Sequence, residues 1–344
     1  MKGRQIVLDH IGESEAAALM VDGRLEDVLI ESPAPAPGTI YRAVALKPVK
    51  GQGGIFLSTP DGNAYLRQIR GISPGSEILV QITGYAEPEK AIPVTDKLLF
   101  KSRYAIVTPD SPGLNISRAI RDDDRRDALM LIAREEMEGN DFGLILRSSC
   151  LEADDEEIAE DIRTMAGVAA QVLGDKGKGE ELLLEGDSPH TLAWRDWVEP
   201  ADIHTAPGGF ADCGVLDALE ALRSSRAPLP GGGALFIEPT RALVAVDVNT
   251  GPDSSLAAGL KANLATAREL PRQLRLRGLG GQIAIDLAPM PKQERRNFEA
   301  ALRRALKADG IDTVLAGFTP LGHYELQRKR ARAPLAGLLP ESLT

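Results

Sequence analysis

The chain has 344 residues, of which 43 % are hydrophobic and 26 % are charged, values that fit two or three ordinary globular domains. Its net charge of −10 excludes a global positive field, so binding of nucleic acid would need a local basic groove or a metal ion. No run reaches the length of a signal-peptide core or a membrane span, and Cys150 and Cys213 lack the CxxC spacing of a zinc site. We therefore expect a cytoplasmic protein in a reducing compartment, without a membrane partner.

The N-terminal segment is rich in predicted strands and ends at a proline-rich boundary. Residues 4–10 have the apolar content of a strand, and residues 13–22 fit either a second strand or a short helix. A turn then leads into a further strand at residues 25–31. Prolines recur from Pro33 to Pro37, and repeated proline can neither pair in a sheet nor continue a helix. A domain boundary is therefore predicted close to residue 36.

The next region consists of short apolar runs separated by turn residues, at positions 40–46, 54–57, 63–67 and 77–82. Short strands at close spacing predict a small β-barrel, and the OB type is the barrel whose open face binds oligonucleotides. The region contains the aromatic residues Phe56 and Tyr65. Tyr65 alternates with Leu66, so one of these two side chains faces outward. Phe56 fits a core position as well as an exposed one.

The following region alternates helix and strand. A helix is predicted at residues 125–138, with N-cap candidates from Asp122 to Asp124, and a second helix at residues 154–173. The strand between them ends on Arg147 and Ser148. An arginine can donate two hydrogen bonds to a phosphate and a hydroxyl can donate a third. Such a pair is also common at the end of an ordinary strand.

In the C-terminal part, two apolar runs each end on an acid, Asp247 in one and Asp286 in the other, and residues 256–277 between them have helical spacing. This order of strand, helix and strand normally makes the strands parallel, so the acids would sit at equivalent strand ends. Converging carboxylates suit Mg²⁺ or Mn²⁺, although strand-end acids more often form only capping or turn hydrogen bonds. Asn249 lies two residues after Asp247 on the same strand face, from which it can hydrogen-bond Asp286.

A set of motifs in this part resembles the catalytic core of the ribonuclease E/G family. The resemblance rests on the order and spacing of Asp-x-Asn at 247–249, Asn-Leu at 263–264, Arg-Gln-Leu-Arg-Leu-Arg at 272–277, Leu-Gly-Gly at 279–281 and Ile-Asp at 285–286. It continues through residues 325–330 and extends more faintly to the N-terminus. Each motif alone is weak, but their combination is specific.

The resemblance implies an α/β (α+β) fold, a ribonuclease H-like mixed sheet with an inserted OB-type RNA-binding barrel. The N-terminal part of the ribonuclease H-like region would occupy residues 1–36, the barrel 37–103, a 5′-phosphate sensor-like α/β region 104–190, and the catalytic metal-binding region 191–344. The sequence has no counterpart of the family's Cys-Pro-x-Cys zinc-link and small domain, so we expect a short form without zinc. A monomer or a dimer is expected.

The activity implied by the resemblance is that of a Mg²⁺-dependent endoribonuclease, with Mn²⁺ as the alternative ion. It would cleave single-stranded RNA in rRNA processing or mRNA decay, leaving 5′-phosphate and 3′-hydroxyl ends. Asp247 and Asp286 would bind the metal, and Asn249 would fix the rotamer of Asp286. The rival hypothesis is an RNA-binding protein of the same fold with little or no nuclease activity. The acidic net charge and the loop at 251–259, which lacks an arginine that the family carries, support the rival.

Further residues are predicted to contact RNA. By the resemblance, Phe56 and Tyr65 would stack on bases, and Arg147 with Ser148 would form a pocket for a 5′ monophosphate. Lys261 is predicted to contact the RNA backbone. Most of the basic residues on this helix and the next are expected to form exposed, solvated faces; besides Lys261 they are Arg268, Arg272, Arg275, Arg277, Arg295, Arg296, Arg303, Arg304 and Lys307.

Overall fold

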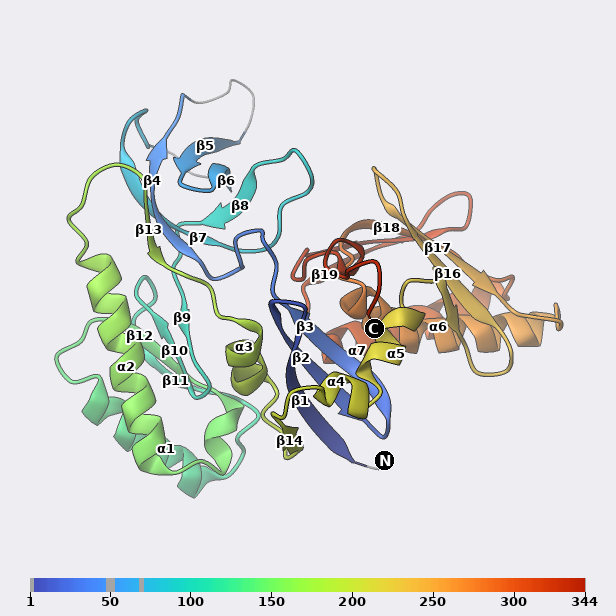
Figure 1. The fold of residues 1–344 in the computed structure, drawn as a ribbon, viewed down its shortest axis with the longest axis horizontal. Coiled ribbons are helices and arrows are strands. Elements are labelled where there is room, and N and C mark those ends of the chain that lie inside the picture. Colours follow the sequence, from blue (N-terminus) through green and yellow to red (C-terminus); the bar gives the residue numbers. More distant parts are fainter. Residues whose placement is uncertain (1–2, 48–52, 68–70, 344) are drawn as a thin grey trace. The chain divides into compact units, whose positions relative to one another are not determined.

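The structure is a computed structural model that describes residues 3–47, 53–67 and 71–343. The chain forms two compact units, one made of Met1–Ser32 together with Ala201–Thr344 and the other of Pro33–Pro200 (Figure 1). The second unit is inserted into the sequence of the first, so we call them the inserted unit and the host unit.

The host unit contains a four-stranded sheet built mainly from the N-terminus. Strands β1 (Arg4–Ile11), β2 (Ser14–Val21) and β3 (Arg24–Ile30) are antiparallel, and β14 (Asp202–His204) pairs in parallel with β1. The segment for which the sequence allows a strand or a short helix is therefore a strand. The buried face of this four-stranded sheet packs on α4 (Gly209–Asp212) and α5 (Val215–Ala221).

A separate six-stranded sheet in the host unit carries the two predicted acids. Its order is β15 (Arg226–Pro228), β16 (Ala234–Pro239), β17 (Val244–Asn249), β18 (Gly281–Asp286), β20 (Tyr324–Arg328) and β19 (Thr313–Phe318). Only β17 and β18 are parallel, and α6 (Leu256–Leu276) connects them. The predicted strand, helix and strand are thus confirmed, and β16 and β17 form a hairpin. The N-terminal strands do not join this sheet.

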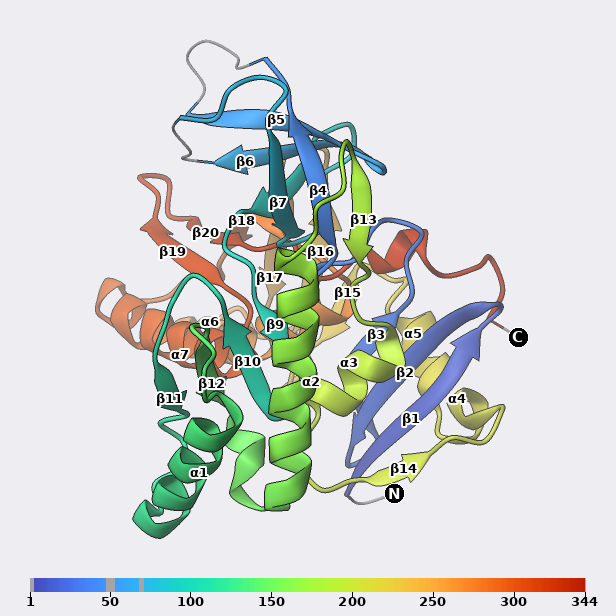
Figure 2. The ribbon, with the colours of Figure 1, turned by 90° about the vertical axis from the view of Figure 1, so that its left-hand side faces the viewer.

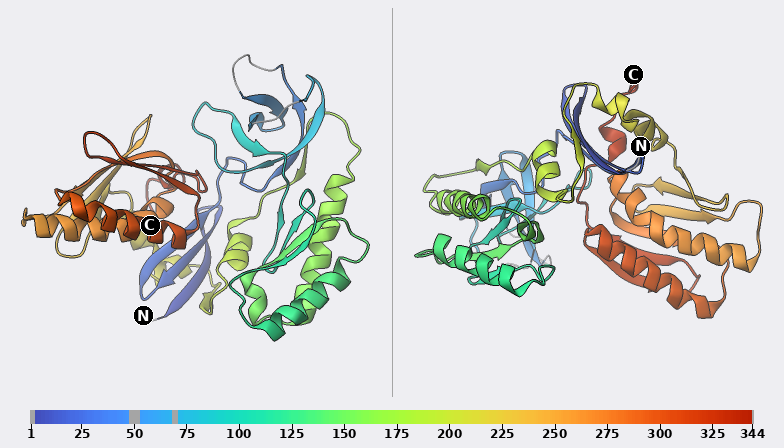
Figure 3. Two further views of the ribbon diagram at one scale, coloured as in Figure 1. Left: turned by 180° about the vertical axis from the view of Figure 1, so that it is seen from behind. Right: turned by 90° about the horizontal axis from the view of Figure 1, so that it is seen from below.

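The two faces of the six-stranded sheet differ in polarity. On one face, Val244, Val246 and Ile285 are buried against α6 and α7 (Arg295–Asp309), which lie side by side in Figure 3. Successive strand residues point to opposite faces, so Asp247 and Asp286 lie on the other, exposed face. Alternation in the sequence therefore leaves one face open for polar chemistry while the helices stabilise the other.

The inserted unit begins with a closed five-stranded barrel. Its strands are β4 (Ile40–Ala45), β5 (Gly54–Thr59), β6 (Gly62–Arg67), β8 (Ile92–Thr95) and β7 (Glu77–Ile82), and β7 returns to pair with β4. Strand β13 (Glu181–Leu184), from far outside residues 37–103, adds to β4 (Figure 2). The buried Arg42 supports this addition, because it forms ion pairs with Asp175 and Glu181 on the returning segment.

The rest of the inserted unit is a second mixed sheet covered by helices. Strands β9 (Phe100–Lys101), β10 (Ala105–Thr108), β12 (Gly143–Leu146) and β11 (Leu114–Ile116) pack against α1 (Asp123–Glu136) and α2 (Asp155–Leu173). Asp122 is the N-cap of α1 and accepts a hydrogen bond from the Arg125 backbone, as its sequence position predicts. The unit ends with α3 (Pro189–Asp196).

The mixed α/β fold with an OB-type barrel is confirmed. Short 3-10 helices complete the chain: η1 (Ser148–Leu151), η2 (Lys292–Glu294) and η3 (Leu335–Gly337). None of the helices in the described part of the chain combines the length and the hydropathy that crossing a bilayer requires.

Candidate active site on the open face of the six-stranded sheet

Asp247 and Asp286 are direct neighbours across two parallel strands. The register pairs Val246 with Ile285 and Asp247 with Asp286, so the two carboxylates project from adjacent backbones roughly 4.8 Å apart. The Asp286 side chain is 69 % exposed, and Asp247 is exposed as well. Asp247 makes no hydrogen bond or ion pair with any residue that the structure describes. The arrangement predicted from the sequence is therefore present in the fold.

A histidine that the sequence analysis missed stands next to Asp286. Strand β20 pairs Tyr324 with Ile285, which brings the preceding residue, His323, beside Asp286. The His323 Nε2 atom is 3.8 Å from the Asp286 Oδ1 atom. A turn between β19 and β20 fixes this position, because the Thr319 N–H donates to the His323 carbonyl. Asp247, Asp286 and His323 thus form a row across three neighbouring strands, which we call the acid row. No local motif marks His323, since it depends on the pairing of β18 with β20.

Two asparagines hold the backbone around the acid row. The Asn249 Oδ1 atom accepts a hydrogen bond from the Gly251 N–H at 2.8 Å and so forms the turn that leaves β17. A hydrogen bond from Asn249 to Asp286 does not occur among the described residues, so this predicted role stays a prediction. Asn263 of α6 is fully buried, and its side chain bonds both backbone groups of Ala288. Asn263 therefore ties α6 to the segment that directly follows Asp286.

The chemistry of the acid row fits a hard divalent cation. Mg²⁺ is commonly held by one or two carboxylates and keeps several waters. The two exposed carboxylates supply such oxygen ligands. Within the described residues, neither of them forms an ion pair with an arginine or a lysine. Among those residues, no group of three or more His, Cys, Asp and Glu side chains is gathered tightly enough to hold a metal by itself. The row is therefore suited to an ion that retains much of its water.

Most of the basic residues on α6 and α7 are exposed, as expected, but three arginines at the C-terminal end of α6 are not. Arg272 and Arg275 are part-buried and Arg277 is 7 % exposed, whereas Arg268 of the same helix is exposed. Arg275 pairs with Glu26, Asp27 and Asp309, which joins α6 to the strand β3 and to the end of α7. Arg272, Arg275 and Arg277 are the exceptions because each also contacts a residue far away in sequence. Lys261 is exposed and lies near Asp253, so its predicted RNA contact stays a prediction.

The barrel aromatics lie side by side on the outer surface of the barrel. Phe56 and Tyr65 are direct partners on β5 and β6, with ring centroids 5.0 Å apart and an interplanar angle of 52°. Both rings are partly exposed, whereas Leu66 is buried, so Tyr65 is the one that faces outward. The alternative of a core position for Phe56 is wrong, because its neighbours Ile55 and Leu57 form the core instead. The pair can offer stacking surface to a base.

The Arg147 guanidinium is already engaged within the inserted unit. It pairs with Asp196 at 2.9 Å and donates to the carbonyls of Ser102 and Arg195. Burial alone would raise the pKa of Asp196, but hydrogen bonds from Arg195 and Arg147 hold it below its usual value. The Asp196 carboxylate therefore competes for Arg147 with any incoming phosphate. Ser148 is exposed next to it, and their role as a 5′-phosphate pocket stays a prediction.

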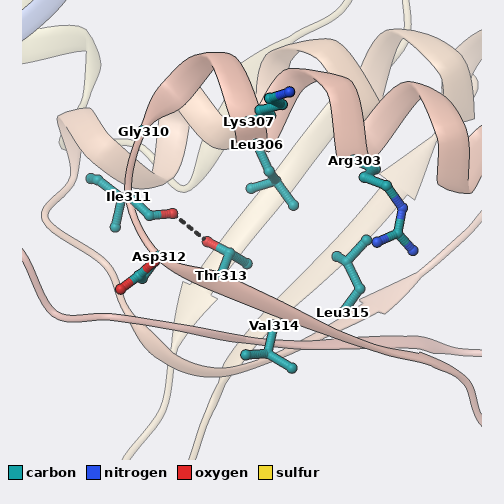
Figure 4. A pocket seen from close by; sticks show the side chains of 9 residues that line it. All are labelled: Arg303, Leu306, Lys307, Gly310, Ile311, Asp312, Thr313, Val314 and Leu315. Carbon is teal, nitrogen blue, oxygen red and sulfur yellow. Dashed lines mark hydrogen bonds between the residues drawn. The ribbon is translucent and has the colours of Figure 1, made fainter. Parts of the chain in front are cut away.

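An open hollow lies elsewhere in the host unit, between α7 and the edge strand β19. Its lining includes Leu306 and Leu315 with Arg303 and Lys307 at its rim (Figure 4). The acid row is not part of this lining. The hollow therefore does not extend the candidate active site.

The inserted unit thus carries an OB-type barrel with paired aromatics, and the host unit carries two carboxylates on an open sheet face. The sequence profile described as the Ribonuclease E/G family matches residues 100–206 and 200–331. This match covers more than half of the chain, which therefore belongs to the ribonuclease E/G family.

Individual relatives support the same assignment. The chain is similar to "Ribonuclease E" of Nostoc sp. (strain PCC 7120 / SAG 25.82 / UTEX 2576), with 25 % identity over 386 residues, covering 95 % of this chain and 56 % of the relative. It is also similar to "Ribonuclease G" of Salmonella typhimurium (strain SL1344), with 25 % identity over 311 residues, covering 78 % and 62 %. A third relative, "Ribonuclease G" of Haemophilus influenzae, is 26 % identical over 307 residues, covering 78 % and 62 %. The chain thus spans less than two thirds of the length of these relatives.

Proposed function

We propose that this chain is a divalent-metal-dependent endoribonuclease that hydrolyses phosphodiester bonds of single-stranded RNA. The observation that carries the proposal is the register of Asp247 with Asp286 on the exposed face of the sheet, in a chain of the ribonuclease E/G family. Mg²⁺, or Mn²⁺ as the alternative, is the proposed ion. The proposed products carry 5′-phosphate and 3′-hydroxyl ends, and the proposed setting is rRNA processing or mRNA decay in the cytoplasm.

The acid row and the two asparagines beside it would have separate tasks in the proposed reaction. Asp247 and Asp286 would hold the cation, which supplies an acidified water and offsets the charge that develops on the phosphate. His323 lies beside Asp286 and would limit the directions in which this carboxylate can turn. Asn249 would shape the loop after β17, and Asn263 would fix the chain after β18. The open face leaves these groups accessible to an extended RNA strand.

The barrel and the family-matched residues of the inserted unit would hold the RNA. Phe56 and Tyr65 would stack on bases, a contact that every base can make and that therefore demands little sequence preference. Arg147 and Ser148 would receive a 5′ monophosphate only when Asp196 releases Arg147. Lys261 would contact the backbone electrostatically.

The test is cleavage of a short, AU-rich single-stranded RNA with a 5′ monophosphate in the presence of Mg²⁺. We expect the wild type to cleave it, and Asp247→Asn and Asp286→Asn to bind it without cleavage. Asp312→Asn is the matched control, because it removes an exposed acid from the start of β19, at the other end of the same sheet. If the wild type binds RNA without cleaving it in Mg²⁺ or Mn²⁺, the chain is an RNA-binding protein of the same fold.

A further inference from the structure

An exposed tryptophan on α3 is unexplained by the functions described so far. Trp194 is 53 % exposed, whereas Trp197 directly after the helix is 8 % exposed and packs inward. Large aromatic side chains are usually well buried, and an exposed one commonly contacts a ligand or another molecule. Trp194 therefore needs an account that core packing does not supply.

The Trp194 ring is held in place on one side. The Arg103 guanidinium lies 5.3 Å from its ring centroid, and the Tyr104 ring meets it edge-on with centroids 6.4 Å apart. Arg103 also donates a hydrogen bond to the Trp194 carbonyl, and the Tyr104 hydroxyl donates to Glu157 at 2.9 Å. The exposed indole is thus a fixed surface, and ordering it on binding would cost little conformational entropy.

The helix that carries Trp194 is itself anchored. Ser188 caps its N-terminus and accepts a hydrogen bond from the Thr191 N–H. At its other end, Arg195 pairs with Asp187 and Asp196, and Asp196 also pairs with Arg147. These contacts orient α3 so that Trp194 stays at the surface.

The charges around the indole favour an anionic ligand with a flat aromatic group. Arg103 pairs with no carboxylate among the residues that the structure describes, unlike Arg147 and Arg195. A guanidinium that no carboxylate neutralises, beside an exposed indole, matches one nucleotide of single-stranded RNA, which brings a base for stacking and a phosphate for the cation. An exposed indole alone would suit a protein partner equally well, and the positive charge of Arg103, which no carboxylate neutralises, is what selects the nucleotide.

We propose that Trp194 and Arg103 form a nucleotide-binding platform on the inserted unit, with the base stacked on the indole and its phosphate contacting Arg103. The platform rests on the proposed function, because it assumes that the chain binds single-stranded RNA. It adds a contact outside the barrel aromatics Phe56 and Tyr65. The covalent reaction at the acid row does not involve it.

The protein carries its own reporter for this test, since Trp194 and the inward-packed Trp197 are its two tryptophans. The probe is a single-stranded A10 oligoribonucleotide added to the full chain in EDTA, which prevents cleavage. We expect RNA to quench the tryptophan fluorescence, and Trp194→Ala to lose the quenching and to bind about 5- to 150-fold more weakly. Trp194→Phe should retain most of the affinity, because a phenyl ring still stacks. Leu131→Ala is the control, since it removes another exposed apolar side chain of the same unit and should change nothing.

A second variant tests the phosphate contact. Arg103→Gln should lower the slope of log affinity against log salt by about 0.7, the value for one phosphate on a single strand. RNA binding without quenching, or equal affinity for wild type and Trp194→Ala, overturns the platform while leaving the nuclease proposal intact. Quenching that depends on protein concentration without RNA assigns the surface to a second copy and also overturns it. If the wild type neither binds nor cleaves RNA, the proposed function fails and the platform fails with it.

Discussion

Four aspartates of the host unit form two pairs that are used in opposite ways. Asp247 and Asp286 are exposed on an open sheet face. Within the described chain, the ion-pair contact of Asp286 with His323 is the one such contact that either side chain makes. The side chains of Asp27 and Asp309 are only 11 % and 3 % exposed, and arginines surround them. Burial of a carboxylate without a cation would be very unfavourable, whereas an exposed carboxylate needs no partner. The buried pair therefore serves the stability of the fold, whereas the exposed pair leaves its oxygen atoms open to solvent.

Replacing one aspartate of each pair with asparagine gives the largest expected effects. Asp286→Asn should reduce cleavage at least about 1000-fold, because it removes a charge that the proposed cation needs. Its free energy of unfolding should change by less than about 0.5 kcal/mol, since the side chain is exposed. Asp309→Asn should do the reverse and lower stability, because Arg275 and Arg328 each lose a buried anionic partner. Cleavage rates and urea unfolding measure both effects, and a large loss of stability in Asp286→Asn would contradict the comparison.

The buried pair can also be tested from its cationic side. Arg275→Met should cost about 3–5 kcal/mol of stability, because it leaves the carboxylates of Asp27 and Asp309 with less compensation in a buried site. Arg268→Met on the same helix is the matched control, and it should stay within about 0.5 kcal/mol because Arg268 is exposed. Urea unfolding followed by circular dichroism checks the difference. Equal effects of the two substitutions would show that the Arg275 network does not stabilise the fold.

The contribution of His323 to the exposed pair should be smaller. His323→Leu is expected to weaken Mn²⁺ binding about 10-fold, because an oriented carboxylate binds a cation better than a mobile one. His323→Gln should recover most of the affinity, since its amide can donate a hydrogen bond to Asp286. Titration calorimetry with the metal alone provides the measurement. Unchanged affinity in His323→Leu would remove His323 from the acid row's function.

The sequence predicts the acid row well where its geometry is local. A strand, a helix and a strand follow one another directly between Asp247 and Asp286. The parallel pairing of the two strands therefore follows from the usual right-handed crossover through a single helix. The barrel was predictable for a similar reason, since its five strands follow one another within about sixty residues. His323 was not predictable, because its place beside Asp286 requires the pairing of β18 with a strand some forty residues later.

The buried arginines show the same limit more clearly. Periodicity places Arg272 and Arg275 on α6, but whether they are exposed depends on Glu26 and the Leu25 carbonyl, about 250 residues earlier. A run of positive charge on a helix is typical of a solvated face, so the sequence alone favours the wrong interpretation. The addition of β13 to the barrel escaped prediction because the two segments are separated by an entire α/β region.

Burial should also control the reactivity of the two cysteine thiols, which is the smallest of the effects predicted for this protein. Burial is the main cause that raises the pKa of the Cys150 thiol to about 12, and it also raises the pKa of Cys213. Since the thiolate is the reactive form, only about one Cys150 in ten thousand is ionised at pH 8. Iodoacetamide at pH 8 should therefore leave both residues unmodified in the folded protein and label both in urea, as measured by mass spectrometry. Rapid labelling of native Cys150 would contradict its inert, buried state.

The insertion of one unit into the sequence of the other has a consequence for synthesis on the ribosome. Strands β1 to β3 emerge first, but the helices and the strand β14 that cover them follow only after Pro200. At about 5–20 residues per second, their apolar face would wait roughly 10 to 30 seconds for its partners, while the inserted unit can fold as soon as it is complete. The N-terminal strands therefore complete their core only after the whole inserted unit has been synthesised. Limited proteolysis of stalled nascent chains should find residues 33–200 protected before residues 4–30.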